Sequence, residues 1–372
     1  MSDVSTGHTL PLFERFPSLQ SALPRIELVS APTAVEHHEA LGREIGYDSL
    51  WIKRDDLSNS IYGGNKPRKL EFVFARLIED GCDSVVTMGG IGTNHGLATA
   101  IFARELGLGC HLVLFDQPLT LHCRKTLRLY HRYGASMHFA PNYPAVAVTT
   151  ARIIASARIA ASGHRKVGLV PAGGTSVPGT LGFVNAGLEL GKQVEQGLIE
   201  APKFIFCAAG SCGTLAGLTL GIRLAGLSTQ VIGVRVVDRI VVNRPHIAWI
   251  INRTLALLRQ HDYALRVPDF SFSDIHLIDG YLGRSYGDVT PKGKRAVEIA
   301  KKHNIVLDTT YTGKTFAALT DFVSEISPKA GPVMFWQTFN SRDLTSEAEQ
   351  VDWRELPEVF RQFFAVERKL VG

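Results

Sequence analysis

Apolar and polar positions along the chain follow two periods that alternate. Short apolar runs, typical of buried strands, are separated by longer segments whose apolar residues recur every three to four positions, as in a helix with one buried face. From residue 84 onward the pattern predicts strands at 84–88, 110–115, 136–139, 167–170, 204–208, 231–236, 305–307 and 332–336. It predicts helices at 94–106, 121–133, 144–162, 178–196, from about 214, and at 241–260, 291–303 and 314–326.

The first 80 residues are less regular. The first twenty-odd residues show neither period and are predicted to be irregular. Strands are expected at 25–29 and 49–54, with a helix near 33–45 between them and another at about 67–80.

This alternation predicts an α/β fold in which parallel-rich, twisted sheets are flanked by helices. A chain of 372 residues usually divides into two domains. In such folds ligands bind beyond the carboxyl ends of strands. Glycine-rich turns follow three predicted strands, at 89–90, 172–174 and 210–213.

One run resembles a membrane helix. Residues 204–222 carry no charge, and Gly213, Gly217 and Gly221 have the spacing of a helix-packing face. However, the stretch from Gly210 to Thr214 is a poor helix interior. We therefore predict a buried strand, a glycine-rich loop and a helix, and no membrane span.

The composition is that of an ordinary globular protein, with 45% apolar and 20% charged residues. The net charge of +5 is spread along the chain, which gives no support to nucleic-acid binding. Five scattered cysteines show no ligand spacing, which indicates reduced thiols and neither a disulfide framework nor a metal site. No secretory signal pattern is present at the N-terminus, so we expect a cytoplasmic protein.

A candidate nucleophile lies in the stretch from Gly63 to Leu70, which reads GGNKPRKL. The two glycines allow close approach of a ligand, and Pro67 suits the first turn of a helix. Lys66 would then lie at a helix N-terminus, whose positive field lowers the pKa of an amine and makes it more nucleophilic. The alternative interpretation is a surface lysine beside Arg68 and Lys69.

A candidate phosphate site follows the predicted strand at 204–208. Backbone N–H groups and hydroxyls at the start of a helix can bind a phosphate, and a plain tight turn is the alternative. The loop consists of Gly210, Ser211, Cys212, Gly213 and Thr214. Gly313-Lys314-Thr315 imitates the end of a nucleotide-binding loop, but Asp308 occupies the position where that motif needs glycine.

Thr93, Asn94 and His95 place a hydroxyl, an amide and an imidazole in successive positions after a predicted strand. All three could face a ligand at the start of the following helix. Thr93 or Asn94 could equally be the N-cap of that helix, and the two roles can coexist. No partner at ligand spacing supports a metal role for His95.

Two of these motifs together resemble a known family. Gly63-Gly64-Asn65-Lys66-x-Arg68-Lys69-Leu70-Glu71 and Gly89-Gly90-Ile91-x-Thr93-Asn94-His95 are similar to those of the pyridoxal-phosphate enzymes of the 1-aminocyclopropane-1-carboxylate deaminase and D-cysteine desulfhydrase family. The resemblance runs from about residue 24 to 340. It implies a tryptophan synthase β-like fold (fold type II) and a homodimer. It also implies a larger cofactor-binding domain, residues 1–79 and 191–372, with a smaller α/β domain, residues 80–190, inserted in it.

The resemblance also implies roles for residues. Lys66 would hold pyridoxal 5′-phosphate covalently, and Lys314 is a weaker rival. The phosphate would lie on the loop 210–214, Asn65 and Asn94 would contact the cofactor, and Thr338 would bond the pyridine nitrogen. Thr93, Asn94, His95 and Tyr286 would contact the substrate, and Thr93 and Tyr286 could take part in proton transfer.

The chain departs from the family pattern at five positions. Thr93 stands where the family has serine, Gly92 where it usually has glutamine, and Cys212 where its phosphate loop has glycine. Phe339 and Asn340 replace two glycines after Thr338 and would add bulk and a polar group near the ring.

The sequence therefore predicts a pyridoxal-phosphate-dependent lyase or deaminase. Its substrate would be a small amino acid such as D-cysteine or 1-aminocyclopropane-1-carboxylate, and its products a 2-oxo acid and ammonia. Two alternatives stay open. One is another β-elimination or β-replacement reaction on the same cofactor, and the other is a protein that binds the cofactor or an amino acid without turnover.

Overall fold

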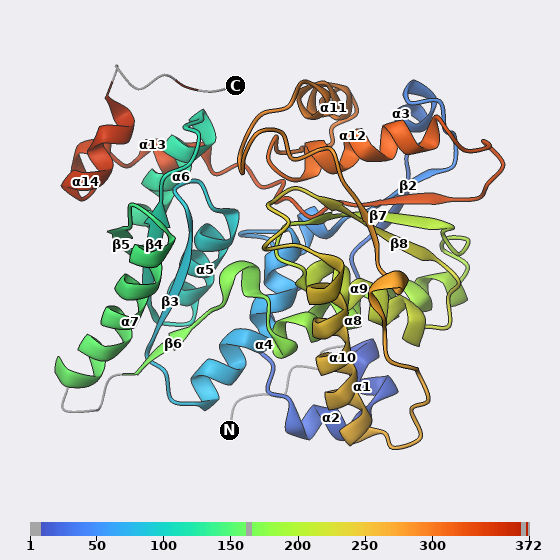
Figure 1. The fold of residues 1–372 in the computed structure, drawn as a ribbon, viewed down its shortest axis with the longest axis horizontal. Coiled ribbons are helices and arrows are strands. Elements are labelled where there is room, and N and C mark those ends of the chain that lie inside the picture. The colour runs from blue at the N-terminus through green and yellow to red at the C-terminus, as the bar shows by residue number, and fades with distance from the viewer. Residues whose placement is uncertain (1–8, 161–165, 366–369, 371–372) are drawn as a thin grey trace.

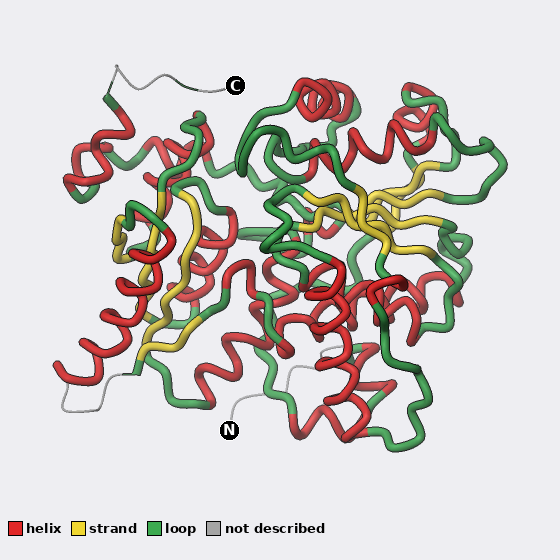
Figure 2. The backbone as a smooth tube through the Cα atoms, in the orientation of Figure 1, coloured by secondary structure: helices red, strands yellow, loops and turns green. Residues whose placement is uncertain are grey.

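The computed structural model describes residues 9–160, 166–365 and 370, and in it the strands form two separate groups (Figure 2). One group is a six-stranded sheet and the other a four-stranded sheet. The strands are β1 (Val35–His37), β2 (Leu50–Lys53), β3 (Ser84–Gly90), β4 (Gly109–Phe115), β5 (Ser136–Phe139), β6 (Val167–Leu169), β7 (Phe204–Ala209), β8 (Gln230–Arg235), β9 (His276–Ile278) and β10 (Val333–Trp336).

Helices lie on both faces of each sheet (Figure 1). They are α1 (Pro11–Arg15), α2 (Pro17–Ala22), α3 (Glu39–Glu44), α4 (Asn65–Glu79), α5 (Asn94–Glu105), α6 (Leu121–Arg132), α7 (Tyr143–Ala160), α8 (Val177–Glu195), α9 (Gly213–Leu224), α10 (Arg244–His261), α11 (Pro291–Lys302), α12 (Thr312–Val323), α13 (Thr345–Glu349) and α14 (Glu358–Arg361). The predicted α/β class with parallel-rich sheets is confirmed.

The six-stranded sheet has the order β1-β2-β10-β7-β8-β9, and only the β1–β2 pair is antiparallel. Helices α3, α11 and α12 lie on one face, and α8, α9 and α10 lie on the other (Figure 1). An apolar core fills each interface, so the strands are buried on both sides, as parallel strands usually are.

The four-stranded sheet has the order β5-β4-β3-β6 and is parallel throughout. Its core includes residues of α5 and α6 and also the C-terminal Phe360 and Phe363. Helix α8, by contrast, packs its buried residues with the core of the larger sheet. The division at residues 79–80 and 190–191 stays a prediction.

The uncharged run from 204 to 222 divides as predicted into β7, a loop and α9. The glycine spacing serves packing within the fold. A Cβ on Gly187 of α8 would lie 2.8 Å from the Cα of Gly221, so only glycines let α8 and α9 approach this closely. Within the described residues we find no helix with the length and apolar character needed to cross a membrane.

Several predicted elements are wrong, and each error has a local cause. Residues 25–29 form no strand, because the N–H groups of Leu28 and Val29 donate to the carboxylate of Glu71. Residues 305–307 pack as a loop whose Val306 carbonyl accepts from Gln337. Residues 11–22 form α1 and α2, the helix predicted at 33–45 is β1 followed by α3, and the edge strand β9 was missed. The last predicted residues of the helix 144–162 lie outside the described residues.

Candidate active site

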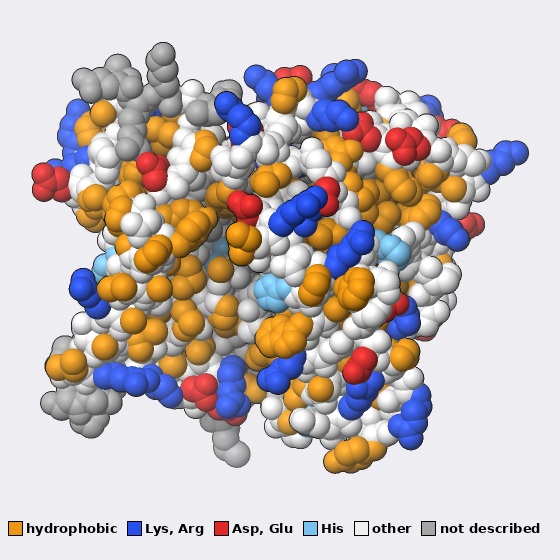
Figure 3. Space-filling view, viewed as in Figure 1, with side chains coloured by type: hydrophobic (Ala, Val, Ile, Leu, Met, Phe, Trp, Pro, Cys, Tyr) orange, Lys and Arg blue, Asp and Glu red, His pale blue; other side chains and the backbone are white. Residues whose placement is uncertain are grey.

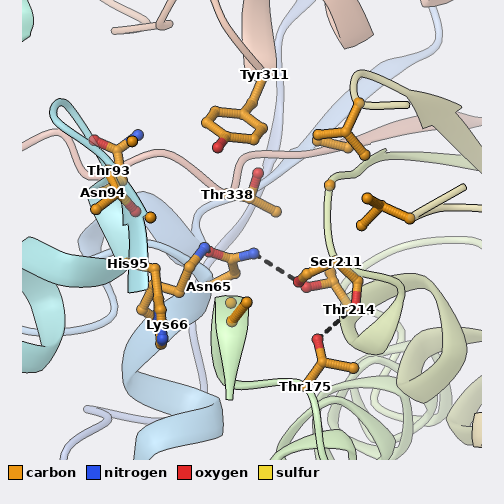
Figure 4. A pocket seen from close by; sticks show the side chains of 18 of the residues that line it. Asn65, Lys66, Thr93, Asn94, His95, Thr175, Ser211, Thr214, Tyr311 and Thr338 are labelled. Atoms are coloured by element: carbon orange, nitrogen blue, oxygen red, sulfur yellow. Dashed lines mark hydrogen bonds between the residues drawn. The ribbon is translucent and has the colours of Figure 1, made fainter. Parts of the chain in front are cut away.

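A cavity of about 510 Å³ lies where the carboxyl ends of strands from both sheets meet the N-termini of α4, α5 and α9. The residues predicted for the site come together here: Asn65, Lys66, Thr93, Asn94, His95, Gly210, Ser211, Cys212, Thr214, Tyr286 and Thr338 line the cavity, and Gly213 belongs to the same loop. Figure 4 shows Thr93, Asn94 and His95 on one side and Ser211 and Thr214 on the other, with Asn65 and Lys66 between them. Their roles stay predictions.

Lys66 lies in the first turn of α4. The chain enters this helix through Gly64 at φ 89°, and a Cβ there would lie 2.6 Å from the carbonyl oxygen of Thr338, so the position requires glycine. The Lys66 Nζ donates to the Oδ1 of Asn65 at 2.6 Å. Burial lowers the pKa of Lys66 to about 8, against the opposing effect of the Asp308 carboxylate. The direction agrees with the sequence prediction, and burial is its main cause.

Beneath Lys66, α4 is fixed by a buried ionic cluster. The guanidinium of Arg68 binds Asp55 at 2.8 Å and Glu189 of α8 at 3.0 Å. Lys53 of β2 binds the same Glu189 at 2.6 Å, and the indole of Trp336 donates to Asp55 at 2.7 Å. Burial by itself would raise the pKa of Glu189, but Arg68 and Lys53 lower it to about 2, so the Glu189 carboxylate stays charged at neutral pH.

The loop 210–214 joins β7 to α9 through a strained turn. Cys212 has φ 68° and ψ −42°, and the N–H of Gly213 donates to the carbonyl of Ser211 at 2.9 Å across it. This is a γ-turn of the rare, strained kind. The hydroxyl of Thr214 accepts from the Asn65 amide at 3.0 Å, and Thr175 donates to the Ser211 carbonyl (Figure 4).

A second lysine lies behind this loop. A Cβ on Gly213 would be 3.1 Å from the Nζ of Lys69, which donates to the carbonyl of Gly173 at 3.0 Å. Burial, followed by the charge of Lys66, holds the pKa of Lys69 well below its ordinary value. An anion bound on the loop would favour the charged form of this amine.

On the opposite side, Thr93 is the N-cap of α5, and its Oγ1 accepts from the N–H of Gly96 at 3.4 Å. The capping role considered from the sequence is therefore present. Asn94 follows as the first helical residue, and its buried Oδ1 has no hydrogen-bond partner among the described residues. The His95 Nε2 faces Thr87 at 3.1 Å, and burial, then Lys66 and Lys69, hold the pKa of His95 well below its ordinary value.

Tyr286 reaches the cavity as one member of a tyrosine pair. Its hydroxyl contacts that of Tyr311 at 2.5 Å. Burial raises the pKa of Tyr286 to about 12 and that of Tyr311 well above its ordinary value. Both phenols therefore carry their protons at neutral pH.

Thr338 points into the centre of the site (Figure 4), and the two residues after it diverge. Phe339 lines both this cavity and a neighbouring one of about 300 Å³. The amide of Asn340 turns back, and its Oδ1 accepts from the N–H of Gly63 at 2.8 Å and from Arg342 at 3.1 Å. The polar group expected near the ring is therefore engaged in bracing the turn before Lys66.

Among the side chains at the site that were given no role from the sequence are Lys69, Thr175 and Tyr311. Each lies close to a motif that the sequence did reveal. Thr175 follows the glycine-rich turn at 172–174, and Tyr311 precedes Gly313-Lys314. Lys314 itself donates to the carbonyl of Leu282 at 2.7 Å and is absent from the cavity lining.

Comparisons with known proteins agree with this geometry. Residues 26–336 match the model of a family described as pyridoxal-phosphate-dependent enzyme. D-cysteine desulfhydrase of Salmonella newport is 34% identical over 325 residues, which cover 85% of this chain and 93% of that protein.

Solved structures extend the comparison. A crystal structure of a 1-aminocyclopropane-1-carboxylate deaminase homologue superposes with a TM-score of 0.74 at 28% identity and covers 91% of this chain and 98% of the other. A pyridoxal 5′-phosphate-dependent aspartate racemase superposes with a TM-score of 0.55 at 14% identity, covering 96% and 99%, a likeness of fold alone.

Proposed function

Because this chain belongs to the family of pyridoxal-phosphate-dependent enzymes, we propose that it is a lyase that converts a small amino acid, D-cysteine first, to a 2-oxo acid and ammonia. With D-cysteine the products are pyruvate, ammonia and sulfide. The observation that carries the proposal is the 34% identity, over 93% of its length, to a protein named D-cysteine desulfhydrase. The facing arrangement of Lys66, Thr93 and the tyrosine pair supports it.

The residues present fit the cofactor. Lys66 supplies an amine of lowered pKa at the cavity floor, and the loop 210–214 with the N-terminus of α9 supplies donors for a phosphate. The buried, unpartnered Oδ1 shows that the Asn94 amide still has hydrogen-bonding capacity to offer inside the site. Thr338 would lie at the pyridine nitrogen, and Asn65 would join Lys66 to the loop through Thr214.

When bound, pyridoxal phosphate supplies an electron sink for negative charge at the substrate Cα. The chain supplies the proton transfers and the orientation. Neutral Lys66 is placed to take the Cα proton, because its pKa of about 8 leaves a substantial neutral fraction near neutral pH. The Thr93 hydroxyl and the N-terminus of α5 are placed to hold the substrate carboxylate.

Tyr286 completes the arrangement as a proton donor. Its phenol is protonated at neutral pH, and Tyr311 can return a proton to it through their shared hydrogen bond. Departure of sulfide from the substrate's Cβ is easier when the leaving sulfur is protonated. Tyr286 is therefore the group proposed to assist the leaving group.

The test is to add D-cysteine to the purified protein loaded with cofactor and to measure sulfide and pyruvate. We expect both products in equal amounts, with L-cysteine turned over more slowly. 1-Aminocyclopropane-1-carboxylate, assayed for 2-oxobutanoate, decides between the two substrates favoured by the relatives. Absorbance changes with D-cysteine but without product would leave an amino-acid binder and refute the lyase.

We further propose a cytoplasmic homodimer, as the resemblance implies. The homodimer is supported by an exposed apolar face over α7, where Val148 is 50% and Ile159 81% exposed (Figure 3). The cytoplasmic location is supported by the five cysteines, which are all buried and free. Light scattering after size exclusion should give twice the mass of the chain. A monomeric mass at micromolar concentration would refute the dimer.

A further inference from the structure

The loop that carries Thr93 is held by side chains from another part of the same sheet. Gly90 and Gly92 have no side chains, and the slot beside them is filled by Gln117, which follows β4. A Cβ on Gly90 would lie 2.0 Å from the Gln117 Oε1, and one on Gly92 would lie 3.3 Å from its Nε2. β3 and β4 run parallel, with Gly90 opposite Phe115. The segments that follow these two strands therefore leave the sheet side by side.

Both polar groups of Gly92 are bound by this neighbouring segment. Its N–H donates to the Oε1 of Gln117 at 3.2 Å, and its carbonyl oxygen is 3.1 Å from the Nε2 of His122 in α6. The Gln117 amide is fixed in turn by donating to the Sγ of Cys123 at 3.4 Å. Residues 117–123 thus clamp the peptide immediately before Thr93.

Gln117 also reaches the opposite side of the site. A Cβ on Gly287, the residue after Tyr286, would lie 3.5 Å from the Gln117 Nε2 and 3.7 Å from the Cδ of Pro118. One carboxamide therefore packs against the loop of Thr93 and against the turn of Tyr286. Gln117 does this without lining the cavity itself.

We propose that Gln117 is a positioning residue for substrate binding, which restores to the loop of Thr93 an amide that Gly92 cannot supply. The inference rests on the proposed function for its substrate and goes beyond it in the residue. The Thr93 hydroxyl has one long contact, from the N–H of Gly96 at 3.4 Å. The Thr93 backbone bonds Gly90 and the Tyr130 hydroxyl, so Gln117 would act on Thr93 through the Gly92 peptide that precedes it. Cofactor affinity should depend on Gln117 much less than amino-acid affinity does, because Lys66, Ser211 and Thr214 belong to other elements and, of the proposed cofactor contacts, Asn94 alone follows this loop.

The decisive variant is Gln117→Met, which keeps the volume in the slot and removes the acceptor. Losing a hydrogen bond of this kind changes an equilibrium by up to about tenfold. We expect amide hydrogen exchange in the peptide containing Gly92 and Thr93 to become about tenfold faster, and the Kd for D-cysteine or D-serine, followed by cofactor absorbance, to rise by about the same factor. The KM for D-cysteine should rise more than kcat falls, and cofactor affinity should change less than amino-acid affinity.

Two further variants separate positioning from folding. Gln117→Glu keeps an acceptor for the Gly92 N–H and should restore wild-type exchange at that peptide. Gln230→Met, at the start of β8, is the matched control.

Unchanged exchange at Gly92 in Gln117→Met overturns the inference, as does a loss of cofactor affinity equal to the loss of amino-acid affinity. The exchange measurement needs no substrate. If the wild-type protein releases no sulfide from D-cysteine, the proposed function fails by itself, and the exchange data still decide the role of Gln117.

Discussion

The two sides of the cavity are built on different interactions. On the cofactor side, α4 rests on buried ion pairs among Lys53, Arg68, Asp55 and Glu189. On the side proposed for the substrate, the loop of Thr93 rests on neutral hydrogen bonds of 3.0 to 3.2 Å from Tyr130, His122 and Gln117. Removing one partner of a buried ion pair leaves an uncompensated charge, whereas removing a neutral partner costs much less.

This difference would let one cavity hold a cofactor firmly and still bind and release a substrate. The groups proposed to hold the cofactor are bonded to one another, since Asn65 bonds both Lys66 and Thr214. The groups that would meet the substrate keep unused capacity, as at Asn94. Substitutions should therefore act on stability and cofactor binding on one side, and on affinity and selectivity for the amino acid on the other.

The largest effect is expected at Lys66. Lys66→Ala should lower kcat by about ten-thousandfold, because it removes the proposed base and the covalent attachment together. Borohydride reduction followed by peptide mapping should find the cofactor on the peptide of Lys66 in the wild type and on none in the variant. Lys314→Met is the control and should keep the label, and a label on Lys314 would contradict the assignment.

The same amine predicts a pH dependence. Only the neutral form of Lys66 can capture an aldehyde, and its pKa is lowered to about 8. The rate at which apoprotein gains cofactor absorbance should therefore rise with pH, with a midpoint near 8, and level off above it. Stopped-flow mixing between pH 6.5 and 9.5 measures this. A rate that still rises steeply at pH 9.5, without levelling off, would show that the amine keeps its ordinary pKa and is not buried in solution.

Arg68→Met should cause the next largest change, this time in stability. Asp55 and Glu189 would keep buried carboxylates without their partner, which costs about 3–5 kcal/mol of unfolding free energy. Urea denaturation of the apoprotein measures it. Arg76→Met, in an exposed pair with Glu79 on the same helix, is the control and should change stability by less than about 1 kcal/mol. Equal effects of the two substitutions would refute the contrast between the sides.

Phe339→Ala tests selectivity on the substrate side. The ring lines both the 510 Å³ cavity and the neighbouring 300 Å³ cavity, so its removal should join them. We expect kcat/KM for D-amino acids with longer side chains to rise about tenfold relative to D-cysteine. Phe339→Leu keeps most of the bulk and should leave the ratio near that of the wild type. An unchanged ratio in Phe339→Ala would show that the ring does not limit substrate size.

The smallest effect is expected at Cys212, where the backbone of the loop 210–214 is strained. Cys212→Gly should be more stable than Cys212→Ala by about 1 kcal/mol, because glycine adopts φ 68° without steric cost and both variants lose the same sulfur contacts. Thermal unfolding of the apoproteins measures the difference. Cys207, in the middle of β7, is the matched control with the opposite sign, since glycine weakens a strand.

Local patterns were sufficient for most of the fold. The alternation of apolar runs and amphipathic segments predicted all four strands of the smaller sheet and helices α5 to α9, because each is defined by its own periodicity. The errors fall where a distant residue decides, as at 25–29, whose backbone N–H groups bond Glu71 and not a neighbouring strand. The edge strand β9 has three residues, too few to show a period.

For the site, the sequence by itself determined which residue types are available and which of them begin helices: Lys66 after two glycines, Thr93 and Asn94 after a strand, and the loop 210–214. Only the tertiary structure decided their neighbours. It placed Lys69 behind the loop 210–214, joined Tyr311 to Tyr286, bonded the Asn340 amide to Gly63 and put Gln117 beside Gly92. The physical reason is that helix starts and strand ends depend on local backbone geometry, whereas contacts between segments far apart in the chain exist only once both sheets have packed.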